Sequence, residues 1–171
     1  MLKENVSKLL NEQITKEFYS AYLYLDMSNY YIENGLDGFG NWFKVQAEEE
    51  VSHAMLFIQF LQNNGEKVTL DLIERPSVEF TGFDVPLHES LKHEQFVTES
   101  INNIYDEAFK IKDYRTMQFL DWFIKEQGEE EKNADELITK YKVFGQDSKG
   151  LYMLNSELGT RVYAPPSLVL D

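Results

Sequence analysis

The sequence predicts an all-α protein in which four long helices form one bundle and a short fifth helix follows. Apolar residues recur at steps of three and four over four long stretches, as on the buried face of an amphipathic helix. Glycine (9) and proline (4) are scarce among the 171 residues, which argues against an all-β chain with many turns. We expect a single domain over residues 1–171, with the bundle at about 5–144, the fifth helix at about 147–158 and a tail at 159–171.

The first two predicted helices form an antiparallel hairpin. One periodic stretch runs from about residue 5 to 33, and a second runs from about 39 to 64. The segment NGLDG at 34–38 has residues suited to end one helix and begin the next, and Asn64-Gly65 ends the second helix. Because the linking turn is short, the two helices must lie side by side.

A long crossover is predicted between the second and third helices. Residues 66–84, EKVTLDLIERPSVEFTGFD, contain Pro76 and Gly82 and fit an extended segment better than a helix. A loop of this length is unusual, but parallel neighbours in a bundle of long helices cannot be joined by a tight turn. The second and third helices should therefore be parallel.

The second half of the chain predicts another hairpin. A third helix is expected from about 84 to 111, with Pro86 in its first turn, and residues 112–114 make the reversal. The fourth helix continues to about 144 and stops at Gly145. Its buried stripe is expected to consist of Met117, Leu120, Ile124, Ala134, Leu137, Ile138 and Tyr141.

A short fifth helix should begin at Asp147, whose side chain can cap it. Its apolar stripe, Leu151, Leu154 and Leu158, follows a four-helix core that is already complete. We therefore expect the stripe to be exposed on a lone subunit and to be covered by association between subunits.

Charge and composition narrow the function. A net charge of −14 disfavours nucleic acid or an anionic membrane as partner and favours cations. The absence of cysteine excludes disulfides, thiolate metal sites and iron–sulfur clusters, and leaves carboxylates, His and Tyr as ligands. The first residues, MLKENVSKLLNEQ, lack the apolar core of a signal peptide, and no other run is long and apolar enough to span a membrane. We expect a soluble cytoplasmic protein.

Polar residues interrupt the apolar stripe of every long helix. They are Glu17 on the first helix, Glu50 and His53 on the second, Glu94 on the third, and Gln127 and Glu130 on the fourth. Four carboxylates in one core require a compensating positive charge, and no Lys or Arg lies on these stripes. A bound cation is the simplest explanation.

The spacing of these residues repeats between the two hairpins. Glu17 and Glu50 are 33 residues apart, and so are Glu94 and Gln127. In both hairpins the midpoint of this spacing falls at the predicted turn. Each arm from turn to polar residue is about 16 residues, or roughly 25 Å of helix, so all six side chains should meet near the middle of the bundle. The pseudo-twofold arrangement predicts two adjacent metal positions.

This pattern resembles the bacterial non-haem ferritins, which belong to the ferritin-like di-iron bundles. The resemblance covers nearly the whole chain and includes the segment KVQAEEEVSHA at 44–54. It implies that Glu17, Glu50 and His53 hold one iron and that Glu50 bridges to a second. Glu94 and Glu130 would complete the second position, with Gln127 beside the pair.

The resemblance also implies roles for residues near the centre. Tyr24 corresponds to a tyrosine beside the iron pair, although it could equally be an ordinary core aromatic residue. Glu49, Glu126 and Glu129 correspond to a third iron site, or else lie on a solvated helix face. Ser52 stands where haem-binding relatives have methionine, so we expect no haem, and Met117 and Leu120 replace the acidic residues of the animal three-fold channel.

The implied function is iron storage and detoxification. A ferroxidase would oxidise Fe(II) to Fe(III) with O2 or H2O2 and deposit ferric mineral inside a homo-oligomeric cage of 24 subunits. The main alternative is a rubrerythrin-like di-iron oxidase or peroxidase without mineral storage. That class usually has an ExxH motif on both paired helices or a Cys-rich domain, and this chain has QxxE on the fourth helix and no Cys. A structural bundle without metal would instead place apolar residues at positions 17, 50, 53, 94 and 130.

Overall fold

The computed structural model describes residues 2–170 and contains five helices. They are α1 (Glu4–Glu33), α2 (Asp37–Asn63), α3 (Val85–Lys110), α4 (Tyr114–Phe144) and α5 (Ser148–Leu158). Within residues 2–170 there is no strand. None of the helices in this range combines the length and apolar character that a membrane crossing needs.

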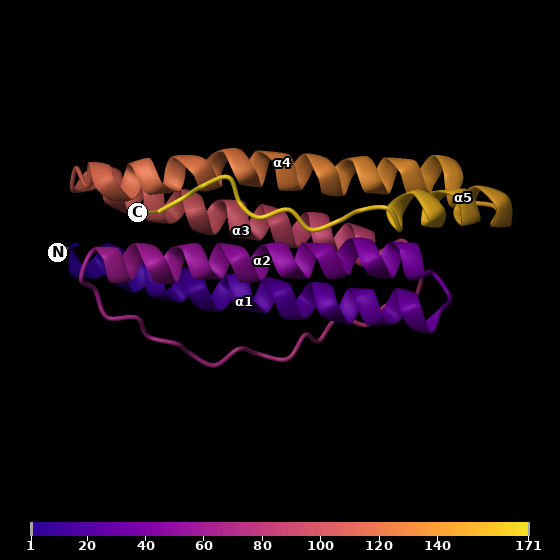
Figure 1. Ribbon diagram of the computed structural model, residues 1–171, viewed down its shortest axis with the longest axis horizontal. Helices are drawn as coiled ribbons and strands as arrows, with labels where there is room; N and C mark the ends of the chain where they lie inside the picture. The colour runs from indigo at the N-terminus through magenta and orange to yellow at the C-terminus, as the bar shows by residue number, and fades with distance from the viewer. Residues whose placement is uncertain (1, 171) are drawn as a thin grey trace.

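The four long helices pack as two antiparallel hairpins, α1–α2 and α3–α4 (Figure 1). The first hairpin turns at Gly35, whose φ of +76° suits glycine, and the second turns at Lys112 with φ +59°. The segment from 64 to 84 runs along the outside of the bundle from the end of α2 to the start of α3 (Figure 1). As predicted, α2 and α3 are therefore parallel.

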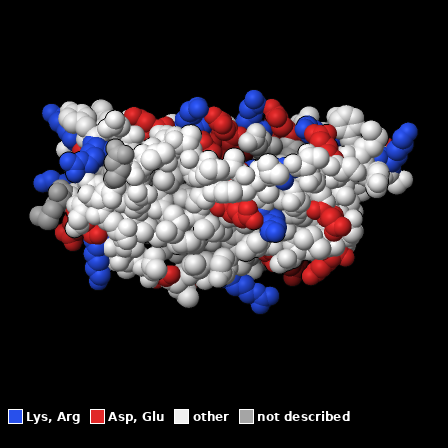
Figure 2. Space-filling model, viewed as in Figure 1, with Lys and Arg blue, Asp and Glu red and all other residues white. Residues whose placement is uncertain are grey.

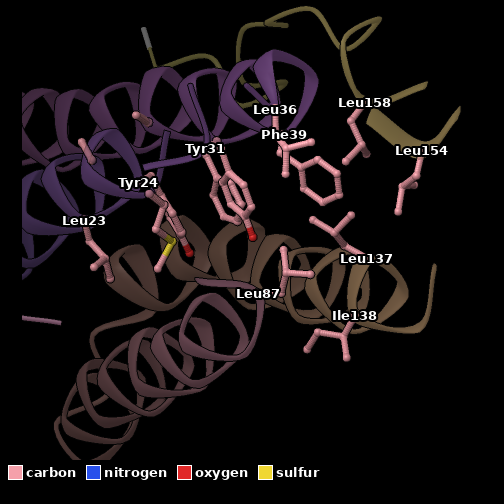
Figure 3. Packing of buried hydrophobic residues seen from close by; sticks show 14 residues of the cluster. Leu23, Tyr24, Tyr31, Leu36, Phe39, Leu87, Leu137, Ile138, Leu154 and Leu158 are labelled. Atoms are coloured by element: carbon pink, nitrogen blue, oxygen red, sulfur yellow. The ribbon is translucent and has the colours of Figure 1, made fainter. Parts of the chain in front are cut away.

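The core consists of two apolar clusters at different heights of the bundle. One cluster, towards the end where α5 lies, includes Tyr24, Tyr31 and Phe39 (Figure 3). The other, towards the N-terminus, includes Leu10, Phe57 and Phe123. On every long helix the predicted polar residues fall between the members of the two clusters. A polar layer therefore crosses the middle of an otherwise apolar core.

Two sequence predictions about buried stripes were wrong. Ile124 is 41% exposed, and Phe123 takes its place in the core, because α4 presents the neighbouring residue to the bundle. The stripe of α5 is buried within the subunit rather than exposed: Leu154 and Leu158 are 2% and 6% exposed and pack in the first cluster, with Leu151 against it. The stripe therefore gives no argument for oligomerisation.

Helix α5 is fixed at its N-terminus and against α2. As predicted, Asp147 caps it, accepting hydrogen bonds from the backbone N–H groups of Lys149 and Gly150 at 3.0 Å each. The Asn155 side chain accepts hydrogen bonds from the backbone N–H groups of Gly38 and Phe39 at the start of α2, at 2.9 and 3.1 Å. These contacts hold α5 across the end of the bundle.

After α5 the chain turns back along the bundle (Figure 1). We call residues 160–170 the C-terminal strap. Hydrogen bonds join Tyr163 to Ser52 at 2.7 Å, Ser167 to Trp122 at 2.9 Å and the Leu170 carbonyl to Gln59 at 2.9 Å. The strap thus lies over α2 and α4 at the height of the polar layer and beyond it. Residues 1 and 171 of the predicted single domain lie outside the described range.

Candidate metal centre

The six polar residues predicted to converge are all buried in the described structure. The exposed fraction is 5% or less for each of Glu17, Glu50, His53, Glu94, Gln127 and Glu130. Each occupies a core position of its helix, where the 3.6-residue period would otherwise place an apolar side chain. Regular helices therefore position the whole set without special loops.

Two groups of possible metal ligands are close enough to share an ion. One ligand atom from each of Glu17, Glu50 and His53 lies within 4.8 Å of the others. The same holds for His53, Glu126 and Glu130. His53 belongs to both groups, and its Nδ1 lies 3.4 Å from Glu50 Oε2.

Amide and phenol groups surround the carboxylates and donate hydrogen bonds to them. Gln13 donates to Glu17 at 2.8 Å, and Gln46 donates to Glu130 at 2.7 Å and to Glu50 at 3.4 Å. Glu94 accepts hydrogen bonds from Gln127, at 3.1 Å, and from the Tyr24 hydroxyl. These donors orient the carboxylates but add no positive charge.

One buried oxygen has no such partner. Glu17 Oε2 is buried and makes no hydrogen bond within residues 2–170. In the same range, none of the four core carboxylates pairs with Lys or Arg. An unpaired buried carboxylate oxygen is costly unless a cation or a proton satisfies it.

The electrostatics of the centre favour that cation. Burial, reinforced by the Glu50 carboxylate, raises the pKa of Glu17 to about 8. Burial and the Glu50 charge likewise raise the pKa of Glu94 to about 8. The pKa values of Glu50 and Glu130 are also raised, by burial and by neighbouring carboxylates. Without a cation the centre must hold protons at neutral pH, and a divalent ion would displace them.

The donor set fits iron. Carboxylate oxygens with one imidazole suit Fe(II) and also hold Fe(III), and the two ligand groups found among residues 2–170 contain no sulfur ligand. Glu17, Glu50 and His53 could hold one ion, while Glu130 and Glu94 are available to a second. The unpaired Glu17 Oε2 supplies a free donor at the first position.

The three residues suggested for a third site are arranged less closely. Only Glu126 belongs to a group of ligands, with His53 and Glu130. Glu49 Oε2 is paired with Arg161 Nη2 at 2.5 Å. Glu129 lies on the solvated side of α4 and pairs with Lys125 at 3.3 Å. Figure 2 shows charged side chains of both signs along the upper edge of the molecule, where Figure 1 places α4.

Sequence reasoning missed three contributors to the centre. Gln13 and Gln46 each lie four residues before a ligand glutamate, so a polar residue one turn earlier on the same stripe was a usable signal. The third is Arg161, which lies far along the chain in the strap, and no periodicity linked it to the bundle. Outside the centre, His93 is partly buried with its Nε2 2.7 Å from Ser20 Oγ, and desolvation lowers its pKa to about 4.

Comparison with known proteins identifies the family of the chain. Residues 7–143 match the model of a family described as the ferritin-like domain. The chain belongs to the ferritin family. The predicted family and the predicted ferritin-like bundle are thereby confirmed.

Relatives within the ferritin family span nearly the full chain. The chain is 40% identical over 153 residues to the bacterial non-heme ferritin of Campylobacter jejuni. The matched region covers 90% of this chain and 92% of the relative. It is 36% identical over 159 residues to a probable bacterial non-heme ferritin-like protein of Haemophilus influenzae, and this match covers 93% of the chain and 96% of the relative. The structure of an open-pore ferritin from Archaeoglobus fulgidus superposes on this one with a TM-score of 0.92 at 38% sequence identity. The superposition covers 95% of this chain and 100% of the archaeal chain.

Proposed function

We propose that this protein is a ferroxidase that oxidises Fe(II) and stores the ferric product inside a protein cage. The observation that carries the proposal is the polar layer: four buried carboxylates and one His, in which no carboxylate pairs with a Lys or Arg among the described residues. Relatives named bacterial non-heme ferritin support the same function. Iron is here the substrate and the stored product.

The residues divide into two iron positions. Glu17, Glu50 and His53 hold the first ion, and Glu50 bridges to the second, held with Glu94 and Glu130. The closeness of Glu17, Glu50 and His53 and the position of His53 beside Glu130 support this assignment. Gln127 and Tyr24 act on the second position by donating hydrogen bonds to Glu94.

A pair of iron ions suits the oxidation chemistry. Two Fe(II) ions give up two electrons, which with two protons reduce one O2 to H2O2, or one H2O2 to two waters. The core carboxyl groups release protons as metal ions bind, because their raised pKa values keep them protonated beforehand. The two apolar clusters border this polar layer on either side along the bundle.

Glu49, Glu126 and Glu129 are proposed to supply a third, weaker iron position on the inner side of the bundle, on the helix face that would border the cage cavity. Its support is that Glu126 lies in the group with His53 and Glu130. We propose no haem function, since Ser52 stands at the relevant position and its hydroxyl bonds Tyr163 in the strap.

We propose that the subunits assemble as a homo-oligomeric cage of 24. Support comes from the exposed apolar residues Tyr152 and Met153 on the outer side of α5, which are 71% and 62% exposed in the subunit. The number of subunits rests on the family resemblance. Acidic side chains on the inner surface would concentrate iron cations there.

One experiment tests both parts of the proposal. Fe(II) is added in air to metal-free protein, the Fe(III) formed is followed by absorbance, and the product is separated by size exclusion with light scattering. Ferric iron that elutes with a large protein assembly supports storage. Rapid oxidation by a monomer or dimer that leaves a precipitate would instead indicate a soluble di-iron oxidase, and no oxidation would contradict both parts.

A further inference from the structure

The C-terminal strap carries one charged residue in positions 160–170, Arg161, and its guanidinium lies at the edge of the metal centre. Its Nη2 pairs with Glu49 Oε2 at 2.5 Å. Its Nη1 donates to Gln46 Oε1 at 2.9 Å and to the Trp42 carbonyl at 3.2 Å. The guanidinium also stacks over the Trp42 ring, 4.3 Å from the ring centroid.

Arg161 also acts on the core through Gln46. Because the Gln46 carbonyl oxygen accepts from Arg161, its amide nitrogen is directed inward, where it donates to Glu130 at 2.7 Å and to Glu50 at 3.4 Å. A single guanidinium thus neutralises Glu49 and orients a donor to two core carboxylates. Arg161 and Glu49 are both largely shielded from solvent, with side-chain exposures of 21% and 19%, which strengthens their attraction.

We propose that Arg161 is a positioning residue that occupies Glu49 as a built-in cation and so restricts the centre to two tightly bound metal ions. The proposal rests on the proposed ferroxidase function. A third ion binds Glu49 more weakly while the guanidinium is in place, because Arg161 Nη2, 2.5 Å from Glu49 Oε2, neutralises the carboxylate and repels a second cation. Affinity for a third ion should therefore rise when Arg161 moves away or loses its charge.

The rest of the strap is held independently of Arg161. Tyr163, Ser167 and Leu170 each make a hydrogen bond to α2 or α4, and Leu168 and Leu170 pack on the apolar cluster near the N-terminus. A substitution at Arg161 should therefore release Glu49 without detaching the strap. This separation makes the proposal testable.

The test is anaerobic binding of Zn²⁺, which does not change oxidation state, to metal-free full-length protein, measured by isothermal titration calorimetry and equilibrium dialysis. Wild type should bind two ions tightly and a third weakly. Arg161→Gln should bind the third ion at least about tenfold more tightly, since its competitor is gone. Arg161→Lys keeps the positive charge, so its affinity for the third Zn²⁺ ion should remain close to that of the wild type.

Two further variants separate this role from general loosening. Arg115→Gln is the matched control: it removes the same charge from an arginine that bonds Asn64 at the end of the bundle. This substitution should leave the affinity for the third Zn²⁺ ion unchanged. Glu49→Gln combined with Arg161→Gln should abolish the gain, because the gain requires the freed carboxylate. Chymotrypsin cleavage after Tyr163 reports whether the strap has detached.

The outcomes are distinct. The Arg161 proposal is overturned if Arg161→Gln binds the third ion as wild type does, or if its gain persists without Glu49. Increased chymotrypsin cleavage with no gain in binding would assign Arg161 to anchoring alone. A different result would contradict the proposed ferroxidase function. In that case the wild type would not bind two Zn²⁺ ions tightly, or Glu50→Ala would bind two ions as tightly as the wild type does.

Discussion

The Tyr24 hydroxyl on α1 donates a hydrogen bond to the Glu94 carboxylate on α3, joining the two hairpins across the polar layer. This bond lowers the pKa of Glu94 against the larger, opposite effect of burial. Tyr24 itself has a pKa raised by burial and by the Glu94 charge, so it keeps its proton and remains a donor.

Replacing Tyr24 by Phe should therefore weaken the second metal position. Without the donor, Glu94 is harder to ionise, and the affinity for the second Zn²⁺ or Fe(II) ion at pH 6.5 should fall by roughly three- to tenfold, the scale of the net contribution of one ordinary hydrogen bond. Anaerobic titration measures this affinity. Tyr31→Phe is the matched control, because its hydroxyl donates to the Phe83 carbonyl outside the centre. Equal effects of the two substitutions would contradict the role of Tyr24.

Glu50→Ala should damage oxidation more than any other single change, because Glu50 is the proposed bridge between the two ions. We expect the rate of Fe(II) oxidation to fall by roughly 100-fold or more, since even outer partners of metal ligands cost about 10–100-fold when removed. Stopped-flow absorbance gives the rate. Glu48→Ala, an exposed neighbour on α2, should retain the wild-type rate. A correctly assembled Glu50→Ala protein with the wild-type rate would refute the assigned centre.

The metal-free protein should lose stability as pH rises from about 4.5 to 8. Burial raises the pKa of Glu17 and Glu94 from 4.5 to about 8, so in this range the folded state holds protons that the unfolded state has released. Stability from these groups is complete below pH 4.5 and is lost as pH passes through 8. Melting temperatures of chelator-treated protein at pH 5 to 8.5 test this.

Two comparisons isolate the carboxyl groups responsible for that trend. Glu17→Gln should show a shallower decline of melting temperature with pH, because one raised pKa is removed. Saturating Zn²⁺ should stabilise the wild type most at the alkaline end, where metal no longer competes with protons. A melting temperature that rises from pH 5 to 8 without metal would show that the core carboxylates are not protonated in the folded state.

Gly38 and Gly128 should respond oppositely to substitution by Ala. A Cβ at Gly38 would lie 1.6 Å from the backbone oxygen of Asn155, so it must displace α5. We expect a loss of roughly 2–3 kcal/mol, as for other overpacked sites. A Cβ at Gly128 meets nothing within 4 Å, and Ala in mid-helix should add about 0.5–1 kcal/mol. Thermal unfolding of both variants decides this, and a neutral Gly38→Ala would contradict the close docking of α5.

The bundle could be predicted from sequence because each long helix repeats its pattern over seven or more turns, and helix ends carry Gly, Asn or Pro. Burial of the six core polar residues followed from the same periodicity. The choice between adjacent apolar residues could not be predicted from this periodicity. Ile124 and Phe123 are neighbours in sequence, and only the packing of the bundle decides which one is buried.

The position of α5 and the strap could not be derived in this way. The leucine stripe of α5 showed that it needs a partner, but periodicity cannot say whether that partner is the same subunit or another one. Arg161 reaches Glu49 across 112 residues of sequence. Such a contact depends on the path of an irregular segment, which carries no repeating pattern.

The division of the core into two apolar clusters has a consequence for how the bundle opens. Each cluster holds one end of the helices together, whereas the layer between them contains side chains that gain little from burial without a cation. Backbone amide protons near Glu17, Glu50, Glu94 and Gln127 should therefore exchange with solvent through local opening when metal is absent. Binding of two ions would link the four helices at the polar layer, so the two apolar clusters would unfold as one cooperative unit. The iron that the protein binds as substrate would thus also stabilise its core.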